Sequence, residues 1–161
     1  MWTEERSRSR SGWHFRVARF RRDSAGTAAI EFAFLAPVLF LLLIGMFQFG
    51  ILINNYIQLT EAVRVGGRTL SISRGAATPF TSARDAIYAS APGLAQGNFT
   101  ITMTVNGTSC AADAACKTTM ASAQGTQATV TASYACTSLF VYGTNFMPGC
   151  TLSSTTSGRV E

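Results

Sequence analysis

The chain has 161 residues, of which 47% are hydrophobic and only 13% are charged, and its formal net charge at pH 7 is +5. The length suits one modest domain, and the mean hydropathy of +0.21 is high for a soluble domain of this size. The positive charge does not indicate a nucleic-acid-binding protein, because most of it lies beside an apolar segment and no basic fold presents it.

Residues 1–26 form a basic segment with seven arginines and three acidic residues. A basic flank beside a membrane span usually stays in the cytoplasm, and its arginines are attracted to anionic lipid. We therefore expect a cytoplasmic leader, followed by a chain whose C-terminal part lies outside the cytoplasm.

Residues 32–53 hold no charged residue, and Gln48 is the only clearly polar one. As a helix they extend about 33 Å, which matches a hydrocarbon core of about 30 Å. A buried core helix is the alternative, but so small a protein has no core that covers such a helix on all sides. The run is longer than the about 7–15 apolar residues of a secretory signal, and no A-x-A-like site follows it. We predict a retained transmembrane helix over residues 27–53.

A carboxylate, Glu31, stands at the start of the apolar run, five residues after Gly26. Acids are costly inside a membrane and are tolerated where they have a partner. If the chain is cut after Gly26, the new amino group of Thr27 lies four residues before Glu31 and supplies that partner, in the same subunit or in a neighbour. The alternative is an N-terminal helix acid favoured by the helix dipole. Glycine disfavours helix, so we expect the backbone at Gly26 to extend into a peptidase.

A basic leader, a glycine, an acid at the fifth mature position and then an aromatic residue, Phe32, resemble the processing site of type IV pilins, in particular the tight-adherence (Flp) branch. Residues 22–75 resemble the TadE-like family of pseudopilins in that system. The resemblance also rests on Pro37, the Phe49–Gly50 pair and the helix that ends in EAVRVGGR.

The resemblance implies an assembly protein of the bacterial inner membrane, not an enzyme. It implies cleavage after Gly26 by a prepilin peptidase, and pairing of Glu31 with Thr27 of a neighbouring subunit during incorporation into a pilus. The partners implied are the peptidase, other pilins and the assembly platform. The chain is longer than the very short major Flp pilins, so we expect a minor pilin that supports pilus biogenesis and surface adhesion. The alternative is a single-span anchored binding module that enters no filament.

Residues 54–75 predict a helical stalk that continues the span. Glu61 and Arg64 are spaced to pair across one turn, and Gly75 and Pro79 are expected to end the helix. Pro37 is expected to kink or loosen the helix inside the span. The stalk's apolar face is predicted from steps of three and four residues and comprises Ile53, Ile57, Thr60, Val63, Gly67 and Leu70.

Residues 76–161 predict a small Thr/Ser-rich α+β domain. A short helix is expected over residues 81–90, with Thr81 or Ser82 as its cap and Ile87 facing inward. Alternating apolar and polar residues, with a turn at Asn106–Gly107, predict an antiparallel sheet packed on the long helix. Its three strands are residues 98–105, 126–136 and 150–160. Residues 123–128 and 138–149 are expected to be loops. Phe140, Tyr142 and Phe146 of the second loop are expected in the core, with a contact surface as the alternative.

All four cysteines lie in this outer domain, where an even number indicates disulfides in an oxidising compartment. Of the three possible pairings we choose the one in which each bond closes a local loop. A zinc site is disfavoured by the spacing and by the lack of a nearby histidine. The chosen bonds are Cys110–Cys116 and Cys136–Cys150.

Residues typical of catalysis are missing outside the leader. The one histidine, His14, lies in the leader, and the remaining acids form no recognisable pair for acid–base chemistry. We therefore expect no enzymatic activity, no cofactor, no metal, no nucleic acid and no small-molecule substrate.

Overall fold

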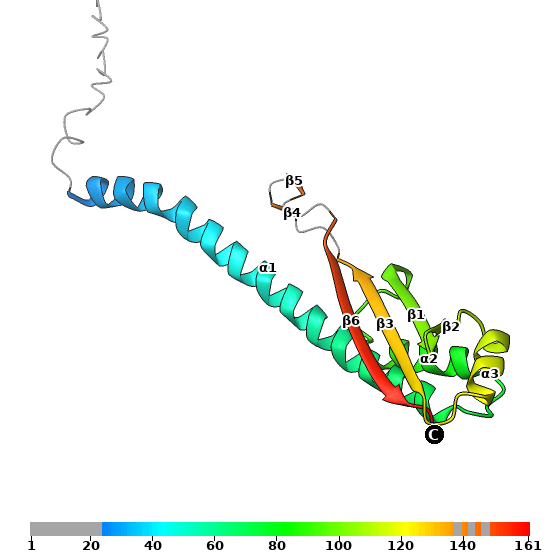
Figure 1. Cartoon of the computed structure of the whole chain (residues 1–161). Coiled ribbons are helices and arrows are strands. Elements are labelled where there is room, and N and C mark those ends of the chain that lie inside the picture. Colours follow the sequence, from blue (N-terminus) through cyan, green and yellow to red (C-terminus); the bar gives the residue numbers. More distant parts are fainter. Residues whose placement is uncertain (1–23, 137–139, 142–143, 146–148) are drawn as a thin grey trace, which may run out of the picture. The chain divides into compact units, whose positions relative to one another are not determined.

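The computed structural model describes residues 24–136, 140–141, 144–145 and 149–161. The chain is α+β, as predicted, and divides into two compact units, Met1–Ile44 and Gly45–Glu161. Residues 1–23 of the leader and the predicted core positions Tyr142 and Phe146 lie outside the described residues, as does the side chain of Phe140. Figure 1 shows the elements, which are α1 (Ser24–Ile72), α2 (Pro79–Ser90), η2 (Gln96–Asn98), β1 (Phe99–Val105), β2 (Thr108–Ser109), α3 (Asp113–Ala121), β3 (Gln127–Ala135), β4 (Phe140–Val141), β5 (Thr144–Asn145) and β6 (Thr151–Arg159).

Helix α1 is continuous over 49 residues and contains Pro37. It begins at Ser24, before the residue expected to start the span. Figure 1 shows it changing direction within the N-terminal stretch that includes the proline, where a backbone donor is missing. After α1 ends, Gly75 adopts a φ of +81°, a conformation that glycine reaches without strain. The predicted end of the helix is therefore confirmed.

The C-terminal part of α1 buries most of the face that was predicted, but not its N-terminal members Ile53 and Ile57. Val63, Gly67 and Leu70 are buried, as predicted, and Leu59, which was not predicted, is buried as well, whereas Ile57 is 55% exposed. Ile57 lies close to the span, which is apolar on every side. The sequence there does not show which side of the helix the domain covers. The ion pair between Glu61 and Arg64 forms as expected, with 3.0 Å between its atoms.

A four-stranded antiparallel sheet has the order β2-β1-β3-β6. The three predicted strands are present, and β2 is added after a turn in which Asn106 and Gly107 both have positive φ, the conformation that this dipeptide favours. In-pointing residues such as Met103 and Val130 are buried, while Ser and Thr line the other face. Thr131 and Thr155 hydrogen-bond across neighbouring strands of that face at 3.0 Å.

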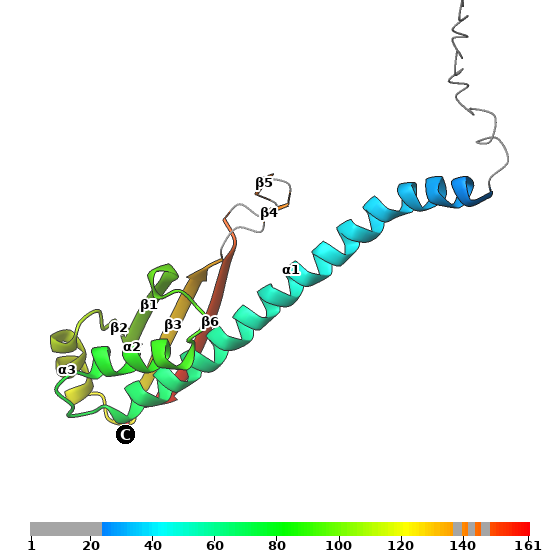
Figure 2. The same cartoon turned by 180° about the vertical axis from the view of Figure 1, so that it is seen from behind.

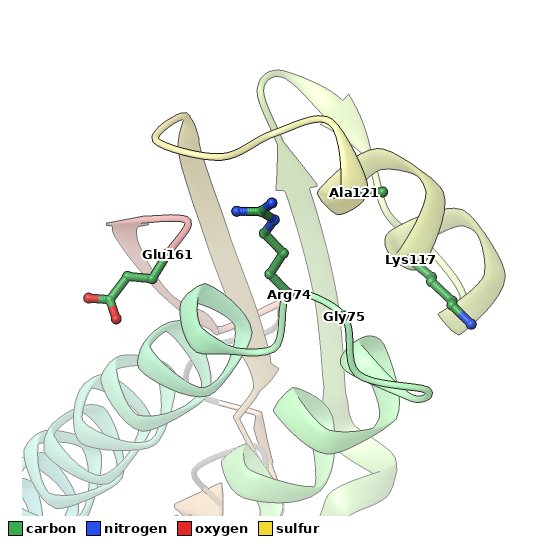
Figure 3. Close-up of a pocket in the computed structure, with 5 residues that line it drawn as sticks. All are labelled: Arg74, Gly75, Lys117, Ala121 and Glu161. Carbon is green, nitrogen blue, oxygen red and sulfur yellow. The ribbon is translucent and has the colours of Figure 1, made fainter.

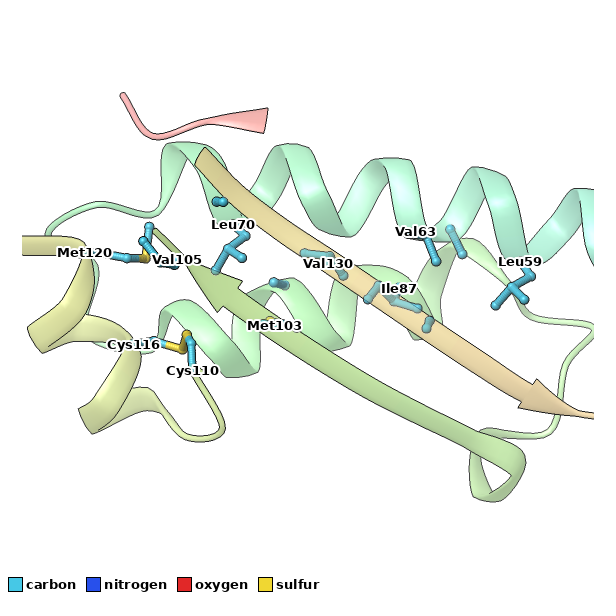
Figure 4. Close-up of a cluster of buried hydrophobic side chains, with 14 of the residues drawn as sticks. Leu59, Val63, Leu70, Ile87, Met103, Val105, Cys110, Cys116, Met120 and Val130 are labelled. Carbon is cyan, nitrogen blue, oxygen red and sulfur yellow. A yellow bond between two sulfur atoms is a disulfide. The ribbon is translucent and has the colours of Figure 1, made fainter. Parts of the chain in front are cut away.

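Helix α2 and the C-terminal part of α1 lie over the same face of the sheet (Figure 2). Helix α2 starts at Pro79, because proline suits the first helical turn. Its N-cap is Thr78, which makes no side-chain capping bond, so the predicted caps were wrong. Ile87 is fully buried, as predicted. Figure 4 shows it in the core with Leu59, Val63 and Val130.

The sequence did not predict α3. Its N-cap is Ala112, which offers no capping side chain, and its exposed positions are mostly Ala and Thr. The helix buries only Cys116 and Met120, a pair four residues apart that lies on one helical face. This short pattern and the acidic residue Asp113 in the first turn were the signals available.

Candidate functional site

The N-terminal part of α1 is an apolar surface without a protein cover. Among the described residues, α1 is the one helix long and apolar enough to cross a membrane, and none of its most apolar window, with a mean hydropathy of 2.4, is buried. Phe34 is 78% exposed and Met46 70% exposed, on a helix whose sides are all apolar. A helix of this kind is stable in lipid, where its own backbone hydrogen bonds are satisfied. It fits a single-pass membrane anchor.

The four predicted processing and assembly residues lie in the first turns of α1. Gly26 and Thr27 are helical, and Phe32 is 64% exposed. Thr27 and Glu31 are four residues apart, so they lie on the same face of the helix. The helical backbone of Gly26 differs from the extended backbone that we expected. A peptidase that needs extended backbone must therefore unwind this first turn, which is inexpensive because helix ends fray.

Glu31 is isolated from other charges along the chain. No other charged residue occurs between Ser24 and Thr60, so this stretch of α1 gives the carboxylate no cationic side chain. An amino group at Thr27 would be one helical turn away. The apolar side chains around Glu31, among them Ile30 at 61% exposed, leave it on a surface that suits lipid or another apolar helix.

Two glycines let the C-terminal part of α1 approach its neighbours closely. A Cβ added to Gly66 would overlap Ile87 of α2 and lie 3.2 Å from the carbonyl oxygen of Ala83. A Cβ on Gly67 would overlap Thr156 of β6. The paired glycines therefore provide the close packing of α1 against both α2 and the sheet.

Asp113 connects the starts of α3 and α2. Its carboxylate accepts hydrogen bonds from the Thr81 backbone N–H at 2.9 Å and from the Thr81 hydroxyl at 2.6 Å. These two bonds favour the ionised form and hold the pKa of Asp113 below its usual value. A contact between residues 32 positions apart was not visible in the sequence.

Two disulfides lie in the outer domain. Cys110 is bonded to Cys116, with 4.7 Å between their Cα atoms, and Cys136 is bonded to Cys150, with 5.3 Å between theirs. These are the two local pairings chosen from the sequence. The first is buried and connects α3 to the residue that follows β2 (Figure 4).

A surface hollow of about 460 Å³ is lined by Arg74, Gly75, Lys117, Ala121 and Glu161. Figure 3 shows the side chains of Arg74, Lys117 and Glu161 pointing in different directions, so they do not converge on one ligand. In the part of the chain that the structure describes, no three His, Cys, Asp or Glu residues are grouped to hold a metal ion. The hollow therefore has no arrangement of groups typical of a catalytic centre.

The apolar helix and the small α+β domain define the class of protein, a membrane protein anchored by one N-terminal helix. Residues 26–68 match the family model described as TadE-like protein, so the resemblance to this family is confirmed over that segment. The family is one of pilus-associated structural proteins rather than enzymes. The match and the apolar helix together fit a membrane protein associated with the tight-adherence pilus. Searches of curated proteins and of solved structures give no match.

Proposed function

We propose that this chain is a pseudopilin, or minor pilin, of a tight-adherence (Flp) pilus. Residues 1–26 are the cytoplasmic leader, residues 27–53 cross the inner membrane, and residues 54–75 form a stalk that carries the outer domain of residues 76–161. A prepilin peptidase removes the leader after Gly26. The processed subunit then supports pilus biogenesis, and through it surface adhesion.

One combination of features supports this proposal above all others. The family match begins at Gly26, and Glu31 is the single charged residue between Ser24 and Thr60 of the helix that follows, whose most apolar part has no protein cover. A carboxylate in a transmembrane helix costs up to about 3 kcal/mol on insertion scales, and less near the helix end. A carboxylate at this position has no role in a simple membrane anchor. In a subunit that assembles through its apolar helix, the same carboxylate can bind a neighbouring subunit.

Cleavage after Gly26 supplies the missing partner. It creates an ammonium group on Thr27, and Glu31 binds it either in its own chain or across a subunit boundary. Only a pair between Glu31 of one subunit and Thr27 of its neighbour determines the axial shift between their two apolar helices. In this proposal the carboxylate sets the register of the filament, while the apolar surface around Phe32 supplies the packing.

The variant Glu31→Ala tests the proposal. We expect pilus assembly to fall to background while the protein still inserts into the membrane, because removal of a charge favours insertion. The measurements are electron microscopy of the cell surface and immunoblotting of membrane fractions. The matched control is Glu61→Ala, which removes an exposed carboxylate outside the span and should leave pili normal. Normal pili in the Glu31→Ala strain would favour the single-span binding module instead.

A further inference from the structure

The outer edge of β6 is a long strand edge without a neighbouring strand. β6 is the last strand in the sheet order, and its nine residues pair with β3 on one side only. At the opposite edge of the sheet, β1 is partly covered by the short strand β2. None of the strands that the structure describes pairs with the second side of β6.

The register identifies the backbone groups on that second side. Cys150 and Val160, at the two ends of β6, are bonded to the β3 side, through Cys136 and Thr126 respectively. Because backbone groups alternate in direction along an antiparallel strand, the other set points away from β3. That set comprises the N–H and C=O groups of Thr151, Ser153, Thr155, Ser157 and Arg159.

Natural sheet edges are usually protected from pairing by short strands, prolines or charged side chains. β6 contains no proline, and its single charged residue is the last one, Arg159. The strand is therefore long and regular enough to act as a template for another strand.

A groove of about 390 Å³ runs between this edge and α1. Its charged lining consists of Arg64, Arg68, Arg159 and Glu161, and the charge of Arg64 is partly offset by Glu61. The exposed side chain of Ile72 adds an apolar wall. The groove thus offers backbone hydrogen bonds, an excess of positive charge and some apolar surface.

We propose that an extended, acidic peptide segment of another protein binds in this groove as a further strand on β6. Main-chain hydrogen bonds to the β6 edge supply affinity, as in other cases of strand addition. Carboxylates of the segment that face α1 bind Arg68 and Arg64, which selects acidic over basic sequences.

A second copy of this chain fits the groove less well. Its acidic residues are scattered along the sequence, so no strand of it is acidic. Symmetric pairing of two β6 edges would also turn the two α1 stalks in opposite directions, which conflicts with anchoring both copies in one membrane. We therefore assign the groove to a different protein.

The test uses the full chain in detergent micelles and a fluorescent peptide as long as β6, with glutamate at every second position and valine or threonine between. Fluorescence anisotropy should show saturable binding that weakens as salt is added. Two control peptides carry lysine in place of glutamate, or N-methyl groups on the backbone nitrogens that would face β6. Both should bind at least about tenfold more weakly.

Two variants locate the site. Ser157→Pro removes an outward N–H and leaves the β3 ladder intact, so it should abolish binding without changing the thermal unfolding of the domain. Arg68→Glu should weaken binding at least about fivefold, whereas the matched control Lys117→Glu, on α3, should not.

The proposal is overturned if the wild-type chain shows no saturable binding. It is also overturned if the N-methylated or lysine peptide binds as well as the acidic one, or if Arg68→Glu behaves like Lys117→Glu. Self-association of the chain that Ser157→Pro abolishes, without peptide binding, would assign the edge to a second copy. None of these outcomes depends on pilus assembly or on cleavage after Gly26.

Discussion

At the residue scale, the contact between Asp113 and Thr81 joins two helices of the outer domain through two hydrogen bonds. The carboxylate replaces the side-chain cap that α2 lacks, since it accepts the backbone N–H of Thr81 in the first turn. The negative charge also lies beside the positive end of the helix dipole. One residue of α3 therefore fixes the start of α2.

This contact predicts a dependence of stability on pH. The pKa of Asp113 is lower in the folded protein than in the unfolded chain, so the ionised group stabilises the fold above the unfolded pKa of about 3.9. That stabilisation is lost as the pH falls from this value through the lower, folded pKa. Thermal unfolding measured by circular dichroism from about pH 6 to about pH 3 should show a smaller loss for Asp113→Asn than for the wild type.

The same titration needs a control carboxylate on an exposed surface. Asp85 lies on α2 next to Arg84 and is exposed, so Asp85→Asn is the matched control for loss of a carboxylate outside the contact between α2 and α3. If Asp113→Asn and the wild type lose stability in parallel below about pH 4, the contact with Thr81 does not contribute as described.

At the element scale, the glycine pair of α1 determines how closely the stalk approaches α2 and the sheet. Replacement of glycine by alanine in a helix normally stabilises it by about 1 kcal/mol. At Gly66 the new methyl group would meet Ile87 Cδ1 at 2.7 Å and the backbone of Ala83, which cannot move without shifting α2. The packing cost should therefore exceed the gain in helix propensity.

We predict that Gly66→Ala lowers the free energy of unfolding of the outer domain by about 1–3 kcal/mol. Chemical denaturation of the full chain in detergent measures this change. Gly50→Ala is the matched control, because an added Cβ there has no atom within 4 Å. A Gly66→Ala protein as stable as the wild type would mean that α1 and α2 are not packed as closely as the structure shows.

Helices and strands could be predicted from the sequence where a local residue pattern determines them. Alternation in β1 and β3 and the Asn106–Gly107 turn were sufficient for the sheet, because strand period and turn chemistry are local properties. Helix α3 was missed since its stability comes from the buried Cys116 and Met120 and from the adjacent disulfide. In the stalk, Val63 and Leu70 were predicted correctly, whereas Ile57 was wrong, because only tertiary packing decides where along the helix the buried face begins.

The candidate site was predictable to a similar, local extent. Gly26, Thr27, Glu31 and Phe32 form a short linear motif, and the family match covers it. The glycine packing at Gly66 and Gly67, the Asp113 contact and the groove beside β6 each join residues distant in sequence. A glycine pair in a helix suggests a close approach, but no spacing rule names the partner in any of these contacts, so identifying the partners required the structure.

At the scale of the whole molecule, the proposed processing site and the folded core lie in different units. The Met1–Ile44 unit holds Glu31 and the start of the apolar surface, whereas the Gly45–Glu161 unit holds the buried core and both disulfides. In the proposed function, processing changes only the first unit. It converts a membrane anchor with an unpaired acid into a subunit whose new amino group can pair with that acid in a neighbour.

The N-terminus of the protein extracted from membranes tests this account most directly. N-terminal sequencing and intact mass should be measured in cells with an active prepilin peptidase and in cells that lack it. We predict a chain that starts at Thr27 in the first case and at Met1 in the second. A chain that starts at Met1 in cells with the active peptidase would contradict the central claim.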